Sequence, residues 1–299
     1  MDLRHLELVR ELADRGSIAA VAAAQHRTPS AVSQQLKTLQ RELGVSLVEP
    51  DGRGLRLTDA GLLLADGAVD VASSVARVRA RWDAFVGEAV GTVTLAAFPS
   101  AAAMFFPALL RDLDGTGIDL VCTDQDAPEH AIGAMVAHHD VVLNHGLTPP
   151  APDPRVRVTP LMREPLDVAV PLGHPLAGRD AVRPADLMDH DWIGVPQGFP
   201  FDTVLQDLAR RTGQVPRVVQ RLRDIRATEA LVAAGHGIAL LPRFTTAPSD
   251  AFALLPLRSV RAGRHVVALS RPDRAERLAV RRVTDLLRTC ADTHVARHA

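Results

Sequence analysis

Residues 28 to 43 carry hydroxyl, amide and basic side chains at a spacing that suits contact with DNA. The apolar residues recur every three or four positions and so form one buried stripe of a helix: Val32, Leu36, Leu39 and Leu43. The opposite face has no acid and consists of Ser30, Ser33, Gln34, Lys37 and Arg41. Hydroxyls and helix-terminal N–H groups hold phosphates, and a glutamine amide can read a base edge in the major groove. The alternative is an ordinary solvated helix face.

A second basic element follows this helix. Leucine alternates with arginine in a segment that predicts a small hairpin, Gly52-Arg53-Gly54-Leu55-Arg56-Leu57. An arginine between glycines at a hairpin tip, here Arg53, is typical of a wing that reaches a minor groove. From Arg15 to Arg41 there are four basic residues and no acid, and the nearest acids are Glu7, Glu11, Asp14 and Glu42. These features favour DNA binding over a solvated face.

Polar residues also stand at the ends of expected strands in the C-terminal part of the chain. Ser100 follows a strand and begins a helix, so its hydroxyl and the N–H groups of Ala101 and Ala102 are placed to hold a carboxylate. A plain helix N-cap is the alternative for Ser100, and the two roles are compatible. Asp124 would suit an amino or hydroxyl group of a ligand, or lie in a surface loop. The strand ends supply these candidates: Thr123, Asp124, Asn144, Gly198, Phe199 and Phe201.

The remaining candidates for chemistry are histidines and cysteines. His138, His139 and His145 suggest a metal site, but no carboxylate or cysteine completes a recognised ligand spacing, so no metal is expected. Cys122 and Cys290 lie far apart and match neither a CxxC redox pair nor a metal-ligand cluster. We expect both to be reduced, buried side chains, which disfavours redox sensing.

Composition limits the possible classes of protein. With 299 residues, 47% of them hydrophobic and 23% charged, the chain suits two or three globular units. The first residues are charged and no apolar run reaches about eighteen residues, so we expect neither a signal peptide nor a membrane span, and a cytoplasmic location. No GxGxxG, GxxxxGK(S/T) or GxSxG motif occurs, so nothing favours an enzyme or a cofactor.

Helices must position the candidate DNA contacts. A three-to-four spacing of apolar residues predicts a first helix over 2–14. Ser17 is then an N-cap for an alanine-rich second helix over 18–25. Thr28 caps the third helix, and Pro29 takes its first position, where a missing N–H costs nothing. The result is a helix, a tight turn and a helix.

A long helix is expected next, from a cap at Thr58 to about residue 88. Its apolar or small residues form a narrow seam of Leu62, Ala65, Val69, Ala72, Ala76, Trp82 and Phe85. A helix of this length cannot bury such a seam by itself and usually pairs with a partner helix. Packing within its own chain is the alternative.

From residue 91 on, short apolar strands alternate with helices, which predicts an α/β domain. Strands are expected at 93–98, 118–122, 140–143, 166–171, 192–195, 216–220, 238–241 and 265–270. Helices are expected at 100–113, 127–138, 184–189, 202–212, 225–234 and 275–290. In such a domain ligands bind beyond the C-terminal ends of the strands.

The N-terminal motifs, in this order, resemble the DNA-binding region of LysR-type transcriptional regulators. The matching pieces are Leu3-Arg4-x-Leu6, Gly16-Ser17, Ala31-Val32-Ser33, Leu43-Gly44-Val45-x-Leu47 and Leu57-Thr58-x-Ala60-Gly61. The resemblance implies a winged helix-turn-helix, a homodimer formed by the linker helix, and a tetramer of such chains. The single lysine among many arginines and alanines is typical of an actinobacterial-like member. Contacts with double-stranded DNA are expected from Thr28, Pro29, Ser30, Ser33, Gln34, Lys37, Arg53 and Arg56.

The chain departs from the family's usual pattern at Pro29-Ser30, at Val48, where the family usually has phenylalanine, and at Pro50. Pro29-Ser30 stands where the family usually has Gln-Pro, which removes an expected base contact and leaves more of the reading to Gln34. Pro50 replaces a usual arginine, which removes a phosphate contact near the wing. Affinity would then depend more on Arg53 and Arg56.

The region after residue 91 resembles the LysR effector domain, in which two α/β subdomains similar to those of periplasmic binding proteins enclose a ligand cleft. The matching pieces are His174-Pro175-Leu176-Ala177 and the segment from Val232 to Pro242. A carboxylate-bearing small-molecule effector would bind in the cleft and change the angle between the subdomains. A small-molecule-binding protein or an enzyme without a DNA-binding role is the alternative. The implied organisation is a winged helix-turn-helix over 1–58, a linker helix over 59–90, and an effector domain over 91–299, with subdomains 91–161 plus 267–299 and 162–266.

Overall fold

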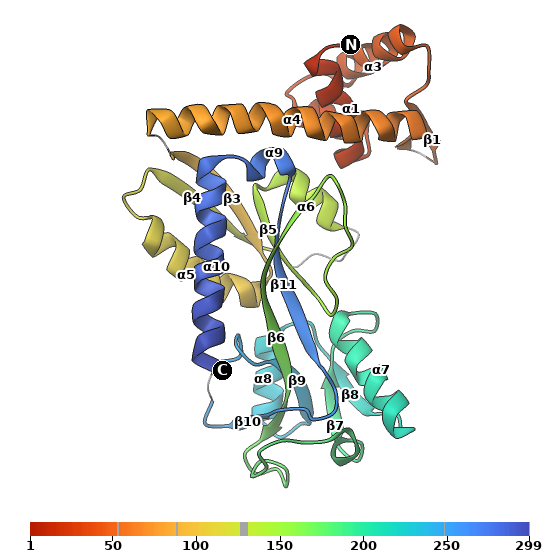
Figure 1. Ribbon diagram of the computed structural model, residues 1–299. Coiled ribbons are helices and arrows are strands. Elements are labelled where there is room, and N and C mark those ends of the chain that lie inside the picture. Colours follow the sequence, from red (N-terminus) through yellow and green to blue (C-terminus); the bar gives the residue numbers. More distant parts are fainter. Residues whose placement is uncertain (53, 88, 126–130, 248, 299) are drawn as a thin grey trace.

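The computed structural model describes residues 1–299 except 53, 88, 126–130, 248 and 299, and it begins with three helices (Figure 1). They lie within one residue of the ends that the sequence predicted: α1 (Leu3–Arg15), α2 (Ile18–Ala24) and α3 (Pro29–Leu43). Each helix starts where a side chain accepts hydrogen bonds from first-turn N–H groups, and these caps are Asp2, Ser17 and Thr28. The apolar faces of the helices meet in one small core, which includes Leu8, Val9, Val21, Val32 and Leu39.

A hairpin and a long helix follow. Strands β1 (Val48–Asp51) and β2 (Gly54–Leu57) pair antiparallel, as the sequence predicted for a wing. The hydroxyl of Thr58 then accepts a 3.1 Å hydrogen bond from the N–H of Gly61 and caps α4 (Asp59–Val86). Position 61 requires glycine, because a Cβ there would lie 2.1 Å from the carbonyl oxygen of Leu47. The hairpin and the linker helix are therefore joined at a fixed, close contact.

The C-terminal domain consists of two subdomains that share one sheet, in the order β4-β3-β5-β11-β6-β9-β7-β8. In the first subdomain the parallel strands are β3 (Gly91–Ala97), β4 (Ile118–Asp124) and β5 (Val141–Gly146). They are covered by α5 (Pro99–Leu113), α6 (Ile132–His138) and α10 (Leu278–His298). In the second the parallel strands are β7 (Asp191–Gly194), β8 (Arg217–Arg221) and β9 (Ile238–Pro242), with α7 (Pro200–Thr212) and α8 (Ile225–Ala233).

Two long antiparallel strands, β6 (Arg157–Pro171) and β11 (Gly263–Ser270), run through both subdomains. β11 also pairs with β5, while β6 also pairs with β9 and with β10 (Phe252–Leu255). The register between β6 and β11 shifts at Val266 and Val267. Each subdomain has its own core, one around Phe105 and the other around Trp192. The two strands are therefore the shared frame of the domain.

Several predicted elements differ from the observed ones. The strand expected at 166–171 is only the second half of β6, and β10 was not expected at all. The helix expected at 275–290 is divided into a short α9 (Pro272–Ala275) and α10, and the helix expected at 184–189 is one turn of 3₁₀ helix, Pro184–Leu187. Polar residues interrupt the apolar run of β6, so periodicity alone underestimates this strand.

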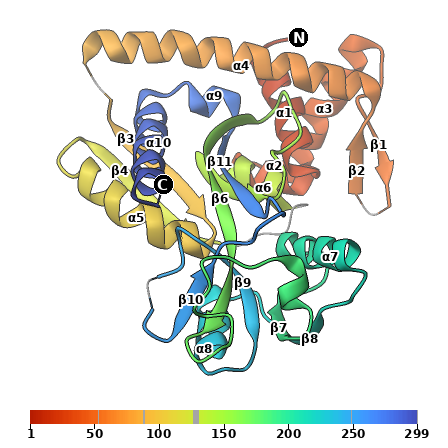
Figure 2. The same ribbon diagram turned by 60° about the horizontal axis from the view of Figure 1, so that its bottom comes forward.

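Helix α4 lies across one end of the C-terminal domain (Figures 1 and 2). It runs alongside α9, and α1 lies beside α6. The three N-terminal helices and the hairpin therefore sit at the same end of the molecule as the first subdomain, and the second subdomain lies at the far end.

Candidate functional site

The polar face of α3 is open to solvent. Gln34 and Lys37 are exposed, Ser30 at the start of the helix is exposed, and Ser33 is half-buried. The buried stripe on the other side is Val32, Leu36 and Leu39, as predicted, whereas Leu43, which was expected to belong to it, is 39% exposed. The exposed face therefore presents an amide, two hydroxyls and a cation, with no carboxylate among them.

The turn before α3 is held by local hydrogen bonds. The Thr28 hydroxyl accepts from the N–H of Ala31 at 3.3 Å, and Pro29 occupies the first turn. The Arg27 guanidinium donates to the Gln35 side chain at 2.6 Å, and that amide donates to the carbonyl of Arg4 at 3.3 Å. An exposed cation is thereby fixed beside the start of α3.

The hairpin contributes less free charge than the sequence suggested. Arg53 lies outside the described residues. Arg56 remains exposed but forms a 2.7 Å ion pair with Glu49, which lies directly opposite it in the strand register. Because the pair is exposed, water screens it and the arginine can exchange this partner for another anion at little cost.

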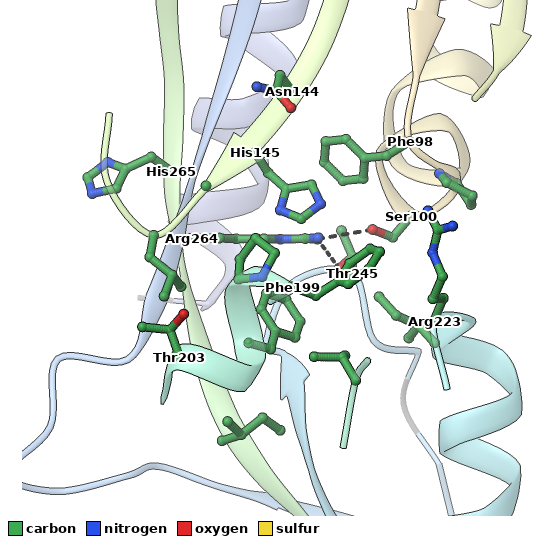
Figure 3. A pocket seen from close by; sticks show the side chains of 18 of the residues that line it. Phe98, Ser100, Asn144, His145, Phe199, Thr203, Arg223, Thr245, Arg264 and His265 are labelled. Carbon is green, nitrogen blue, oxygen red and sulfur yellow. Dashed lines mark hydrogen bonds between the residues drawn. The ribbon is translucent and has the colours of Figure 1, made fainter. Parts of the chain in front are cut away.

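A cavity of about 840 Å³ lies between the two subdomains (Figure 3). The first subdomain contributes Phe98, Ser100, Asn144 and His145 to its wall. The second subdomain contributes Gly198, Phe199, Phe201, Thr203 and Arg223. The volume lies within the range of roughly 300–1,000 Å³ that holds a small organic molecule.

Arg264 of β11 stands at the centre of this cavity (Figure 3). Its Nη2 donates to the Ser100 hydroxyl at 3.1 Å and to the Thr245 hydroxyl at 2.9 Å. Its Nε donates to Glu164 at 2.7 Å, and both side chains of this ion pair are at most 1% exposed. The other oxygen of Glu164 accepts from the N–H groups of Phe244 and Thr245, at 2.8 and 2.7 Å. A buried ion pair is tolerated only with such additional hydrogen bonds, so the guanidinium is held in one place.

Aromatic rings surround the guanidinium. Arg264 lies over the ring of Phe98 at 4.9 Å, and His145 meets the same ring edge-on at 4.5 Å between centroids. Burial, and then the charge of Arg264, lower the pKa of His145 to about 3, so its imidazole is neutral near pH 7. Its Nδ1 is buried and bonds to no protein atom among the described residues. The site thus combines a fixed cation with a neutral imidazole and aromatic walls.

Two helices begin at the cavity, α5 after Phe98 and α7 after Phe199. Neither N-cap residue has a side chain that accepts a hydrogen bond from the first turn. The N-terminal ends of helices favour anions because their N–H groups lack intrahelical acceptors. Arg223 adds a second guanidinium, which lies 4.7 Å from the centre of the Phe199 ring. The start of α5 is therefore a place where a negatively charged group is favoured, while Asp202 already lies in the first turn of α7 and Asp224 also lines the cavity.

The predicted ligand contacts divide into two groups. Ser100, Asn144, Gly198, Phe199 and Phe201 line the cavity.

The other three predicted contacts, Ala101, Thr123 and Asp124, do not line it. The Ala101 side chain is 1% exposed and packs into the core, while Thr123 and Asp124 are exposed on the edge strand β4. For Thr123 and Asp124 the wall next to β4 is formed instead by Gln125, one residue beyond the strand, whereas the prediction for Ala101 concerned its backbone N–H group.

The sequence reading missed Arg264, Glu164 and Thr245. Arg264 and Glu164 are direct partners in the register of β11 and β6. Both residues lie just outside the strands expected at 166–171 and 265–270, so those strands did not bring the two charges together. Their sequence separation of 100 residues hid the pairing.

Neither a metal site nor a reactive thiol is found in the part of the chain that the structure describes. Among those residues, no three His, Cys, Asp or Glu side chains lie close enough together to hold a metal ion. His138 lies beside Arg15, whereas His145 lies in the cavity. Cys122 and Cys290 are both unpaired and half-buried, and burial raises the pKa of each thiol. Within the same residues, every helix is too short or too polar to span a bilayer.

Two family profiles match the chain. Residues 3–62 match the profile described as bacterial regulatory helix-turn-helix protein, lysR family, and residues 87–291 match the LysR substrate binding domain. Among curated proteins, the chain is 28% identical to the transcriptional dual regulator GltC of Bacillus subtilis (strain 168) over 249 residues, which cover 83% of this chain and 82% of the relative.

Solved structures share the fold. A full-length OxyR variant from Pseudomonas aeruginosa has a TM-score of 0.66 at 20% identity, over 97% of this chain and 98% of that chain. Full-length CbnR in complex with its target DNA has a TM-score of 0.55 at 23% identity, over 97% of this chain and 100% of that chain. At these identities the likeness concerns the fold alone.

Proposed function

Because this chain belongs to the LysR family of DNA-binding transcriptional regulators, with a C-terminal effector-binding domain, we propose that α3 enters the major groove of a promoter or operator. The observation that carries this proposal is the exposed, acid-free face of α3. Gln34 would read a base edge, while Ser33 and Lys37 would hold phosphates. Further backbone contacts would come from Thr28, Pro29, Ser30, Arg53 and Arg56.

A gel-shift experiment tests this proposal. The purified chain is titrated into a labelled duplex taken from upstream of its own gene, and into a random duplex of equal length. We expect retardation of both at low salt, because phosphate contacts are not sequence-specific, and of the first alone as salt rises. Absence of retardation at low salt would contradict DNA binding.

We propose that the effector carries a carboxylate and an apolar body. Support comes from the fixed guanidinium of Arg264, the Ser100 hydroxyl beside it, and the start of α5. The rings of Phe98, Phe199 and Phe201 would surround the apolar part. The neutral imidazole of His145 would meet a polar group of the ligand without adding charge.

A thermal-shift screen of the full chain tests the ligand class. Aliphatic and aromatic carboxylates are compared with their primary amides, because a ligand that binds only the folded state raises the unfolding temperature. We expect stabilisation by an acid and not by its amide. Equal stabilisation by both members of each pair would contradict the carboxylate.

We further propose that α4 forms a homodimer and that dimers associate into a tetramer in the cytoplasm, without catalytic activity. Of the seam expected from the sequence, Ala65 and Val69 are buried within the chain. Support for the dimer comes instead from an exposed apolar seam on α4, defined as Val75, Val78, Trp82 and Phe85, each more than half exposed. The spacing of three and four residues is that of a helix pair. An isolated helix would leave this seam in water.

A further inference from the structure

A cluster of charges joins the first helix to the effector domain. We call it the docking cluster, and it consists of Arg10, Glu11, Asp14 and Arg15 on α1 with Arg271 and Asp273 at the start of α9. Glu11 and Asp14 lie on α1, so the DNA contacts proposed for α3 do not explain these two acids. Figures 1 and 2 show α1 beside α6 and α9, at the end of the molecule opposite the second subdomain.

Two carboxylates hold the cluster together. Glu11 accepts from Arg271 Nη1 at 2.8 Å with one oxygen, and from Arg15 Nε at 2.5 Å with the other. Asp273 accepts from Arg10 Nη1 at 3.0 Å and from Arg271 Nε and Nη2 at 3.1 and 3.0 Å. Arg271 is thus bonded to one acid from each side of the interface.

The cluster is buried even though it is charged. Arg10, Glu11 and Arg271 are 7%, 7% and 6% exposed. Burial opposes ionisation of Glu11, but hydrogen bonds from Arg15 and Arg271 outweigh it and lower its pKa. Losing one member of a buried charge group leaves an uncompensated charge, which is far more costly than losing a surface pair. The contact between α1 and α9 therefore depends on each charged side chain of the docking cluster. When the two surfaces separate, water solvates all of these charges again.

The same strand connects this cluster with the ligand cavity. Arg264 lies near the start of β11, and Arg271 directly follows its last residue, Ser270. The two arginines are seven residue steps apart along the chain, a length of about 23 Å in an extended strand. β11 is hydrogen-bonded to β5 on one side and to β6 on the other. A displacement at one end of a strand paired on both sides is carried to its other end.

We propose that the docking cluster is a latch that holds the DNA-binding domain against the first subdomain, and that β11 couples the latch to Arg264 in the cavity. A ligand that engages Arg264 then changes the docking of α1, and with it the placement of α3. The coupling part rests on the function proposed above, whereas the latch itself does not.

Hydrogen exchange of the full-length protein, followed by mass spectrometry, tests the latch without DNA or effector. The variants are Glu11→Gln and Arg271→Met, each of which removes a charge that bridges the interface. We expect exchange about fivefold faster than in the wild type in peptides covering 8–15, 136–140 and 271–275, because undocking exposes these segments. Arg271→Met leaves the DNA-binding domain unaltered, so α3 should keep its wild-type protection in that variant.

Glu276→Gln is the matched control. Its carboxylate is 3% exposed and bonded to Arg157 at 2.8 Å and to Arg281, all within the effector domain. Peptides 8–15 should exchange at the wild-type rate in this variant. Wild-type exchange of the same peptides in Glu11→Gln and Arg271→Met, or equal acceleration in the control, would overturn the latch.

The coupling is tested at the cavity end of β11. The double variant Arg264→Met with Glu164→Gln removes the buried ion pair without leaving a lone charge. We expect altered exchange in 271–275 and 8–15, while Arg223→Met, a cavity substitution outside β11, leaves both segments unchanged. If the double variant alters hydrogen exchange only in peptides that line the cavity, β11 does not transmit the change to the docking cluster, and the proposed coupling is wrong. Since neither DNA nor an effector is present, this failure is distinct from failure of the proposed function.

Discussion

Arg264 gives the cavity a cation whose position is fixed before a ligand arrives. Glu164, Ser100 and Thr245 hold its guanidinium from different sides. A side chain that is already ordered loses little conformational freedom on binding, so more of the interaction energy is available for affinity. The pairing with Glu164 also reduces the net positive charge of the site, so the start of α5 is needed to favour an anion.

Ser100→Ala tests the carboxylate contact. The Ser100 hydroxyl lies 3.1 Å from Arg264 Nη2, at the start of α5. We expect affinity for the carboxylate found in the screen to fall at least about tenfold, since a hydrogen bond to a charged group contributes roughly 1.5–3 kcal/mol. Titration calorimetry measures the change, and Thr123→Ala, exposed and outside the cavity wall, is the matched control. Unchanged binding by Ser100→Ala would refute the contact.

The neutral His145 predicts a pH dependence of stability. Its pKa is lowered from 6.5 to about 3 by burial and by Arg264, so between these values the unfolded chain binds a proton that the folded chain does not. Stability from this residue is therefore present above 6.5 and is lost as the pH falls toward 3.

Between about pH 7.5 and about pH 5.5, we expect the wild type to lose about 1 kcal/mol more unfolding free energy than His145→Gln. Urea unfolding at the two pH values measures the difference, and comparison with the variant removes the contribution of the other histidines. Parallel pH profiles would mean that the imidazole is not held neutral in the folded state.

Helix α3 is the element on which sequence reading depends. Gln34→Ala removes an amide able to read a base, at a cost of about 1–3 kcal/mol for the preferred sequence. We expect discrimination between the upstream duplex and a random duplex to fall. Lys37→Met is the comparison variant, and it should weaken binding to both duplexes alike and reduce the salt dependence by about one charge. Fluorescence anisotropy over a salt series distinguishes the two, and unchanged discrimination by Gln34→Ala would exclude Gln34 as the reader.

Helix α4 is the element on which the dimer depends. Val78 is 67% exposed, at the middle of the apolar seam. Val78→Glu places a carboxylate there, and burying it against a partner helix would leave the charge unpaired. We expect at least about tenfold weaker dimerisation by sedimentation velocity, the equivalent of about 1.4 kcal/mol. Arg77→Glu, one residue away and off the seam, makes an even larger charge change and should leave the dimer intact.

The elements show how far the sequence was sufficient. Helices α1 to α4 were predicted because caps and apolar periodicity are local signals, and the structure confirms the caps at Ser17, Thr28 and Thr58. The full length of β6 was not predictable in this way. Its central residues, Arg163 and Glu164, are polar, and they belong to a strand because of partners about 100 residues away.

The ligand site shows the same division. Ser100 was predictable because strand ends and helix starts are local features that mark the binding edge of an α/β sheet. Arg264 was not predictable, because arginine is almost never buried unless it is paired, and its partners could not be identified from local sequence features. Asp124 was misplaced, since the end of an edge strand looks the same in sequence as the end of a central one.

At the scale of the whole molecule, two binding regions are connected by two strands. β6 and β11 run through both subdomains, so a rotation of one subdomain changes the surroundings of Arg264 and of Arg271. A ligand shifts such an equilibrium only if it binds the two arrangements with different affinity. In the coupling proposed above, the cavity would supply that difference for the effector, and the docking cluster would supply it for the DNA-binding domain.

This connection predicts a measurable reciprocity. The effector must change the affinity for DNA by the same factor by which DNA changes the affinity for the effector, and we expect a factor of about 5 to 150. In Arg271→Met the factor should approach one, while the effector still binds without DNA, because Arg271 does not line the cavity. Anisotropy of a labelled duplex with and without the carboxylate, and calorimetry with and without the duplex, measure the two sides. Glu276→Gln should keep the wild-type factor. If Arg271→Met also kept the wild-type factor, the coupling between effector and DNA would not depend on the docking cluster.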